Sequence, residues 1–430
     1  MDTPSADSDS SAGRPRLAPR IRDRKAGPGR LLTLPTSVDD IVSLRGSFLA
    51  YPDLASGDDV LQNLSVSMLD RGTEFRDRFE LAQVLEECGA KLDLSSDGLY
   101  VECSGRALTE DLPRVMDVLA EMLRHPSFDE REFEKARAQA AAEVRRRMEK
   151  TGAQAAAALS RRLFAPAHPN YSDAPEDVLR RIQRVTVDDV REYHERHFGA
   201  TGWTLAVVGD LDHDRVETVV AEAFGDWDGH EPEPTHETDA TAGEDPDKSN
   251  VDVRLGQSLS LRRDDPDYPA LYVGNYILGG NFSARLMRTV RDEQGLTYHI
   301  GSRLAGVTAR YDGYWQVNVT LSPEVLDEGI DVTRTVIREF VEEGATDEEL
   351  ADKKTTITGS YTVGLATTSR LAQSILTNAE RGFDVEYLDR FPREIEALSL
   401  NEVNDAVRRH LRPEALHEAL AGVEPDPVEA

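Results

Sequence analysis

The same order of expected elements occurs twice along the chain, and this duplication limits what the chain can fold into. A strand-like run opens each half, at 41–49 and at 251–261, and each run precedes a helix rich in small residues. The two halves therefore begin alike.

The expected helix starts also repeat at a constant interval. Long helices are expected to begin at 128–133 and 346–350, about 218 positions apart, and later helices at 186–190 and 399–403, about 213 positions apart. Each start has an N-cap residue followed by acids, which satisfy free amides and complement the helix dipole. These intervals predict a duplicated α+β unit of roughly 200 residues, because solenoid repeats run to only about 20 to 50 residues.

Composition divides the chain into two domains, a linker and two tails. Residues 228–250 lose the periodic apolar pattern and are rich in Pro, Thr, Glu, Asp and Gly, which predicts a solvated linker. The domains are then expected at 31–227 and 251–421, with a disordered tail at 1–30 and a short tail at 422–430.

The charge of the chain limits its partners. There are 80 acidic and 50 basic residues, a net charge of −30, which argues against nucleic acid or an anionic membrane as a partner. Only seven of the basic residues are lysines, and this bias is typical of a halophilic protein; a mildly acidic protein from a GC-rich bacterium is the alternative. The basic run 14–30 is expected to be mobile, with docking on an acidic partner as its alternative.

The N-terminal sequence and the cysteine count limit the cellular location and the thiol chemistry that we expect. The first 27 residues contain no apolar stretch of the kind that a secretory signal or a membrane span requires, so we expect a cytoplasmic protein. Cys88 and Cys103 are the only cysteines, too few for a disulfide scaffold or a cysteine zinc site. Both are expected to be buried free thiols.

Arg291 and Tyr298 are the candidate catalytic residues. The pattern over 281–294 predicts a helix that ends at Gly295, followed by a strand over 296–302. Both side chains can then point into the space past the helix end, where a guanidinium and a phenol could hold a peptide carbonyl. On spacing alone, a surface arginine and a core tyrosine would be the favoured interpretation.

The segment 278–298, which carries Arg291 and Tyr298, resembles the C-terminal domain of the pitrilysin or insulinase-like metallopeptidases, the inverted-zincin family. The resemblance covers about 31–420 and includes Arg-Asp-Asp-Pro-Asp-Tyr at 263–268 and Val-Val-Gly-Asp at 207–210. It implies two homologous α+β domains, each a mostly antiparallel sheet flanked by helices, that together form a half-shell. It also implies that Arg291 and Tyr298 contact the substrate near the scissile bond.

The zinc motif of the family is degenerate in this chain. Active members carry H-x-x-E-H on a helix, where two histidines bind zinc and the glutamate acts as general base. Counting back from Gly72-Thr73 places Asn63, Val66 and Ser67 at these three positions. The third ligand of the family corresponds to Glu143, which alone cannot hold zinc, so an ordinary helix glutamate is the favoured interpretation and no metal is expected.

Other candidate sites are weaker. Gly279-Gly280-Asn281 lacks the Lys and Ser/Thr of a phosphate-binding loop, so with Phe282 it is expected to approach a substrate or another chain. The pair His194 and His197 has no evident third ligand. Residues 91–100 match the family strand that pairs with the substrate, but a structural role is favoured beside a degenerate metal site.

The resemblance implies the non-metal subunit of a heterodimeric zinc endopeptidase that acts on unfolded peptides. A homologous H-x-x-E-H chain would supply the zinc and the base, and this chain alone would hydrolyse nothing. The alternatives are a structural or assembly subunit without catalysis and a chaperone-like peptide binder. The sequence also leaves a homodimer open.

Overall fold

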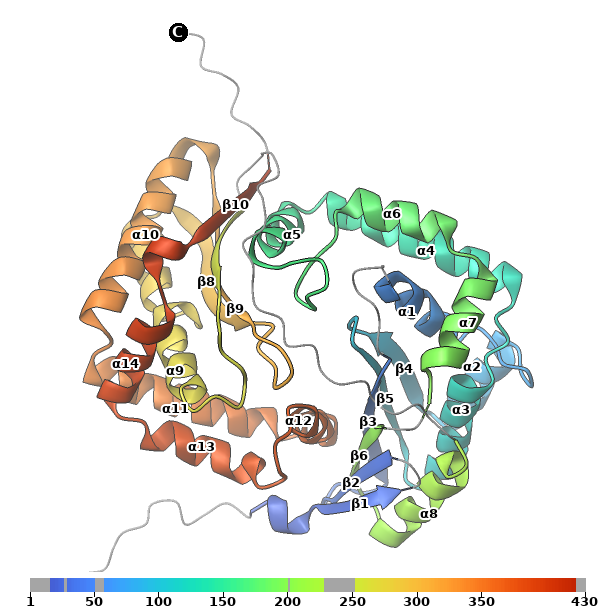
Figure 1. Ribbon diagram of the computed structural model, residues 1–430. Coiled ribbons are helices and arrows are strands. Elements are labelled where there is room, and N and C mark those ends of the chain that lie inside the picture. The colour runs from blue at the N-terminus through green and yellow to red at the C-terminus, as the bar shows by residue number, and fades with distance from the viewer. Residues whose placement is uncertain (1–15, 27–28, 51–57, 200–201, 228–251, 423–430) are drawn as a thin grey trace, which may run out of the picture.

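Two lobes make up the computed structural model, which describes residues 16–26, 29–50, 58–199, 202–227 and 252–422. In Figure 1 the sheet of each lobe lies toward the middle of the molecule, with most helices outside. The first sheet has the strand order β1-β2-β6-β3-β5-β4, and the second has the order β10-β7-β9-β8. The strands are β1 (Arg22–Ala26), β2 (Gly29–Pro35), β3 (Ile41–Leu49), β4 (Lys91–Ser96), β5 (Tyr100–Leu108), β6 (Thr204–Gly209), β7 (Asp252–Ser258), β8 (Thr297–Ala305), β9 (Tyr314–Leu321) and β10 (His417–Ala421).

The two sheets share one topology. The order β6-β3-β5-β4 corresponds strand for strand to β10-β7-β9-β8, and β1 and β2 extend the first sheet. Among the described strands, every pairing is antiparallel except that of β2 with β6. The α+β fold class is confirmed, with two homologous domains that form a half-shell.

The helices repeat in the same order as the strands. They are α1 (Asp58–Val66), α2 (Arg78–Glu87), α3 (Leu112–Arg124), α4 (Glu130–Met148), α5 (Thr151–Leu163), α6 (Pro175–Arg184), α7 (Val187–His197) and α8 (His213–Phe224) in the N-terminal half, and α9 (Tyr268–Gly279), α10 (Leu326–Glu343), α11 (Asp347–Gly364), α12 (Thr368–Glu380), α13 (Tyr387–Ala397) and α14 (Leu400–His410) in the C-terminal half. Thr186, Thr346 and Ser399 form capping boxes at the starts of α7, α11 and α14, and Asp129 caps α4. These four starts are the ones that the sequence predicted.

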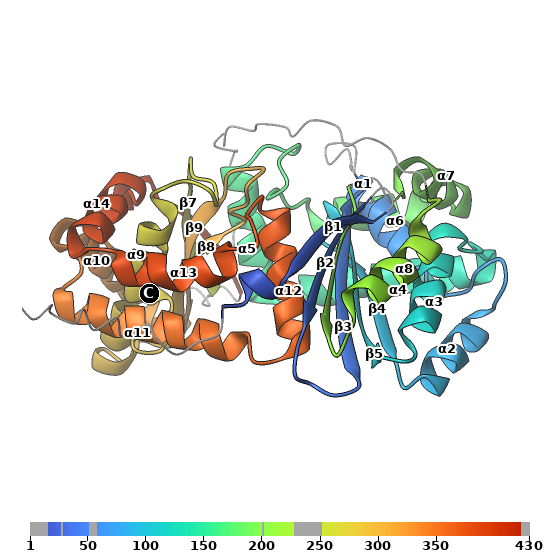
Figure 2. The same cartoon turned by 90° about the horizontal axis from the view of Figure 1, so that it is seen from below.

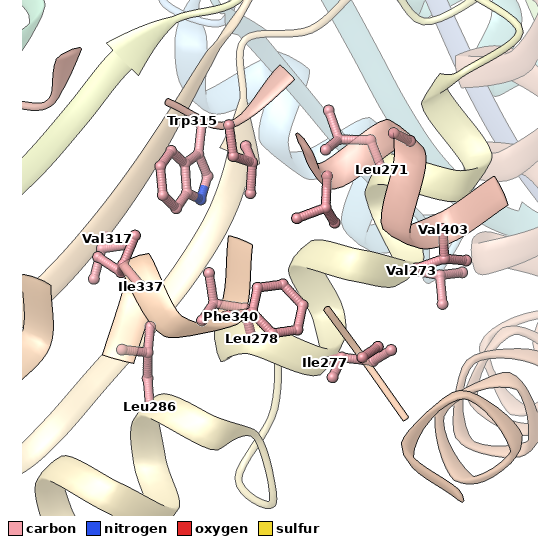
Figure 3. Close-up of a cluster of buried hydrophobic side chains, with 14 of the residues drawn as sticks. Leu271, Val273, Ile277, Leu278, Leu286, Trp315, Val317, Ile337, Phe340 and Val403 are labelled. Carbon is pink, nitrogen blue, oxygen red and sulfur yellow. The ribbon is translucent and has the colours of Figure 1, made fainter. Parts of the chain in front are cut away.

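One face of each sheet packs on a helical layer to form the core. In the C-terminal half, Trp315 and Val317 of β9 join Leu278 of α9 and Phe340 of α10 in one buried cluster (Figure 3). In the N-terminal half, apolar residues of β3 and β5 pack in the same way under α3 and α8. Cys88 and Cys103 are buried there as free thiols, as expected.

Each half also places one helix on the sheet of the other half. Helix α12, from the C-terminal half, covers β3 and β6, whereas α5, from the N-terminal half, covers β7 and β10. Figure 1 shows α5 against the second sheet, and Figure 2 shows α12 beside the first. Because α5 and α12 hold equivalent places in the repeat, this exchange is reciprocal. The expected domain boundaries therefore separate the halves in sequence but not in space.

The described chain begins earlier than the tail predicted at 1–30 would allow. Strand β1 pairs antiparallel with β2, with Arg22 opposite Thr33. The amides of Leu17 and Ala18 donate to the carboxylate of Asp389 on α13, each over 3.0 Å. The prediction of a tail was wrong for this segment, because a short polar edge strand carries no apolar alternation.

Residues 1–15, the expected linker at 228–250 and residues 423–430 lie outside the described part of the chain. Among the described helices, none combines the length and the apolar character that crossing a bilayer requires.

Candidate functional site

Arg291 lies on a π-helix, Met287–Glu293, whereas the sequence predicted a regular α-helix over 281–294. The amide of Gln294 donates to the carbonyl of Thr289, five residues earlier, over 3.1 Å. A π-helical turn holds an extra residue, and such turns are frequent at functional sites. An extra residue in a turn shifts the side chains that follow it around the helix axis, so the helix that carries Arg291 differs from the α-helix that the sequence predicted.

Tyr298 lies in a β-bulge of β8. Thr297 pairs with Leu321 and His299 pairs with Thr320, so Tyr298 has no partner residue on β9. A bulge redirects the side chain that it carries and is common next to active sites. Tyr298 is 95% exposed, which excludes the alternative of a core tyrosine.

The two candidate catalytic residues flank the turn at Gly295, whose φ of +67° ends the helix where the sequence predicted. The side chain of Arg291 is 30% exposed, and its only ion pair in the described part of the chain is with Asp292, 3.5 Å between Nη1 and Oδ1. Its Cζ lies 4.6 Å from the ring centre of Phe282. Because guanidinium and phenol groups both donate hydrogen bonds, this helix exit can bind a carbonyl oxygen.

Gly279 and Gly280 are explained by packing within the chain. A Cβ on Gly279 would lie 2.6 Å from Cβ of Ser302 on β8, and one on Gly280 would lie 2.7 Å from Cα of Tyr276. The close backbone approach that the sequence predicted is therefore to the chain's own α9 and β8. Contact of these glycines with a substrate stays a prediction.

Asn281 and Phe282 form the loop that leads into the helix of Arg291. The side-chain oxygen of Asn281 accepts hydrogen bonds from N and Oγ of Ser283, over 3.1 and 2.9 Å. Phe282 lies within the helix that the sequence predicted over 281–294, but it precedes the observed helix and is 68% exposed, whereas Leu286 and Val290 are fully buried. Its contact with a substrate also stays a prediction.

Lys353 of α11 also belongs to this site, although no motif in the sequence points to it. Lys353 is only 6% exposed, and its Nζ donates to Oγ of Ser283 over 2.6 Å, so α11 holds the loop in place. A single sequence contains no signal for this contact beyond the rarity of lysine.

The positions of the zinc motif lie on α1 and directly after it. Asn63 is exposed, Val66 is buried in the core, and the hydroxyl of Ser67 donates to the carbonyl of Leu64 over 2.8 Å. An amide, an isopropyl group and a hydroxyl supply none of the imidazole, thiolate or carboxylate ligands that zinc takes. Among the described residues, no group of three or more His, Cys, Asp or Glu could hold a metal ion.

Glu143 lies on α4 with 42% of its side chain exposed. It pairs with Arg146 and with Arg147, the latter at 3.5 Å between Oε1 and Nε. This is the ordinary helix glutamate that the sequence favoured.

Comparisons with known proteins identify the family. The model described as "Peptidase M16 inactive domain" matches residues 184–357, and the model described as "Insulinase (Peptidase family M16)" matches residues 63–168. The chain belongs to the insulinase family of peptidases, M16.

Individual proteins are also similar to this chain. The non-peptidase homologue YmxG of Helicobacter pylori is 24% identical over 358 residues, which cover 81% of both chains. Subunit 1 of the mitochondrial cytochrome b-c1 complex of Bos taurus is 24% identical over 228 residues, or 49% of this chain and 45% of that subunit. A crystal structure of a peptidase M16 inactive domain from Pseudomonas fluorescens has the same fold, with a TM-score of 0.82 at 23% identity over 95% of this chain and 100% of that chain.

Within the M16 family this chain lacks the zinc motif, because H-x-x-E-H does not occur anywhere in its 430 residues. The side chains at the equivalent positions do not fit zinc. No catalytic step on this chain can therefore use a metal held there.

The histidine pair does not replace the M16 zinc site. His194 is 8% exposed, and its Nε2 lies 2.9 Å from the carbonyl oxygen of Leu123. Burial lowers the pKa of His194 to about 4, so this ring is neutral near pH 7. The ring of His197 lies against that of Tyr193, tilted by 35°, with 4.5 Å between ring centroids.

Strand β4 is an edge strand beside the degenerate site. It forms the outer edge of the first sheet and contacts α1, where the hydroxyl of Ser96 donates to the side chain of Gln62. The edge thus lies where the family resemblance placed it, next to a helix without zinc ligands.

Proposed function

We propose that this chain is the non-metal, substrate-binding subunit of a heterodimeric zinc endopeptidase that acts on unfolded peptides. The observation that carries the proposal is the exposure of Tyr298 beside Arg291 in a chain whose zinc positions hold no ligand. A helix exit that carries a guanidinium group and a phenol can serve catalysis if the metal belongs to another polypeptide. Pairing with a homologous chain supplies that metal.

In the assembled pair, Arg291 and Tyr298 bind the substrate backbone beside the scissile bond. Their N–H and O–H groups donate hydrogen bonds to a carbonyl oxygen and stabilise the negative charge that develops on it. Holding the peptide in one orientation lowers the barrier further. The partner, an H-x-x-E-H chain, contributes the zinc and the general base.

The proposal is tested by assaying a peptide library with this chain alone, with an H-x-x-E-H homologue alone, and with both, at low and high salt. We expect EDTA-sensitive cleavage from the pair and none from this chain alone. Arg291→Ala should lower the turnover of the pair without changing its zinc content. Arg288→Ala is the matched control, because Arg288 lies on the same π-helix and is 58% exposed. Robust cleavage by the isolated chain would contradict the proposal. So would a pair whose turnover is the same with and without the Arg291→Ala substitution.

The second candidate function is a structural or assembly role without catalysis, or peptide binding without cleavage. It is favoured by the similarity to subunit 1 of the bovine cytochrome b-c1 complex and to a homologue described as a non-peptidase. Co-purification from native cells separates the candidates. The peptidase proposal requires a zinc-bearing relative among the captured chains, whereas peptide binding by the lone chain, unaffected by zinc, favours the binder.

A further inference from the structure

Phe282 is a large apolar residue that is exposed to solvent. Its side chain is 68% exposed, although a phenylalanine gains most when it is buried. The ring contacts Arg291, whose Cζ lies 4.6 Å from the ring centre. This distance is within the range of an attractive cation–π interaction.

The backbone that carries the Phe282 ring is fixed on both sides. On one side, Nδ2 of Asn281 donates to the carbonyl of Tyr276 over 2.7 Å, which ties the loop to the end of α9. On the other side, Oγ of Ser283 accepts from the buried Lys353 and donates to Asn281. The ring therefore stands on a rigid loop, whereas Arg291 reaches it through a long flexible side chain.

We propose that Phe282 is a positioning residue that holds the guanidinium group of Arg291 in the orientation in which it binds a peptide backbone. A cation–π contact restrains a guanidinium group through its charge and leaves its N–H groups available as donors. The contact with Phe282 thus restricts the orientation of Arg291 without occupying its donors. The role of Phe282 in turnover rests on the proposed function, but its contact with Arg291 does not.

The contact itself is tested by NMR on the full chain labelled with ¹⁵N-arginine, with the Arg291 Nε–Hε signal assigned from Arg291→Lys. The ring current of Phe282 should shift this signal upfield. Phe282→Leu should return it to the position of a free arginine, and Phe282→Tyr should preserve the shift. An Arg291 signal that Phe282→Leu leaves unmoved would overturn the proposal.

Phe79 provides a matched control. It is 73% exposed, and Cζ of Arg78 lies 5.3 Å from its ring centre. Phe79→Leu removes an exposed ring of the same size from α2, in the N-terminal half. It should leave the Arg291 signal in place, and a shift caused by this variant would show that the readout is not specific.

Turnover by the assembled pair provides a second, separate test. Phe282→Leu should lower kcat/KM by roughly two- to five-fold, as expected for an exposed cation–π contact, and by the same factor for every peptide. In the Arg291→Ala background the same substitution should have no effect, because the two residues act as a unit. A loss that depends on one side chain of the peptide would instead mean that Phe282 binds substrate directly, and would overturn the positioning role. If the wild-type pair cleaves nothing, the proposed function fails while the NMR experiment still decides the contact.

Discussion

Glu380 shows how the junction between the halves changes the chemistry of one side chain. It ends α12 and accepts a hydrogen bond from Oγ of Ser47 on β3 over 2.6 Å. The pKa of Glu380 is raised to about 7, mainly by burial and also by the nearby carboxylates of Glu102 and Asp97, while the Ser47 hydrogen bond and Arg381 oppose the shift. The native chain therefore holds a proton there that the unfolded chain releases near its ordinary pKa of 4.5.

This proton predicts the pH dependence of stability. Because the native state binds more protons between about pH 4.5 and pH 7, the contribution of Glu380 falls as the pH rises through that window. Glu380→Gln should make the chain more stable than wild type at pH 8, by about 1 to 3 kcal/mol, and nearly equal at pH 4.5. Urea unfolding at both pH values measures the difference. If Glu380→Gln changed the free energy of unfolding equally at the two pH values, the raised pKa of Glu380 would be contradicted.

Tyr298 should matter for turnover and not for folding. Its side chain is 95% exposed, so Tyr298→Phe should change the free energy of unfolding by less than about 0.5 kcal/mol. Loss of one donor to the developing charge should lower kcat of the assembled pair by about 10²-fold. Urea unfolding of the lone chain and peptide assays of the pair measure the two effects. Unchanged turnover of the Tyr298→Phe pair would show that the hydroxyl of Tyr298 takes no part in catalysis.

At the scale of elements, two irregular elements carry the side chains of Arg291 and Tyr298. The π-helix of Arg291 and the β-bulge at Tyr298 each insert an extra residue into a regular element, on either side of one glycine turn. Irregular turns of this kind are retained where they redirect a side chain. The close packing of α9 against β8 keeps both elements in place.

A substitution at Gly279 tests this packing. Gly279→Ala should destabilise the chain by about 1 to 3 kcal/mol, because its Cβ would lie 2.7 Å from the backbone nitrogen of Ser302. Gly359→Ala is the matched control on α11, where a Cβ meets no atom within 4 Å. There alanine should stabilise the helix by about 0.5 to 1 kcal/mol. Thermal unfolding of both variants measures the effects. A Gly279→Ala variant as stable as wild type would show that β8 can move away from α9.

Regular elements could be predicted from the sequence, but the irregular ones could not. Caps and acids mark the starts of α4, α7, α11 and α14 because they act locally on free amides. The π-helix leaves no such mark, since Leu286 and Val290 have the spacing of an ordinary α-helix. The exposure of Phe282 and the contact of Lys353 depend on segments that are distant in sequence, and a single chain does not encode them in any local pattern.

At the scale of the molecule, the reciprocal helices join the two halves. On α12, Leu371, Ile375 and Leu376 are buried against Leu32 and Leu34 of β2. On α5, buried residues four apart mark an apolar face, but the sequence does not say which sheet that face covers. The covering of each sheet by the other half is therefore a property of the whole chain.

Separating the halves tests this dependence. A fragment of residues 1–227 lacks α12, so the apolar side chains of β2 and β6 that share a buried cluster with α12 would be exposed. We expect this fragment to bind a hydrophobic dye and aggregate when expressed alone, because each exposed leucine forfeits about 1.5 to 3 kcal/mol. Co-expression with residues 228–430 should restore a soluble complex with one unfolding transition. A fragment that unfolds cooperatively on its own would show that α12 is dispensable.

The mutual covering of the two sheets has a consequence for inheritance. A tandem gene duplication usually leaves two copies that can be lost, shuffled or separated independently. Once each copy shelters the other, deletion of either leaves an unprotected remnant. Loss of either half is then costly to the other, so we expect the two halves to be kept together through evolution.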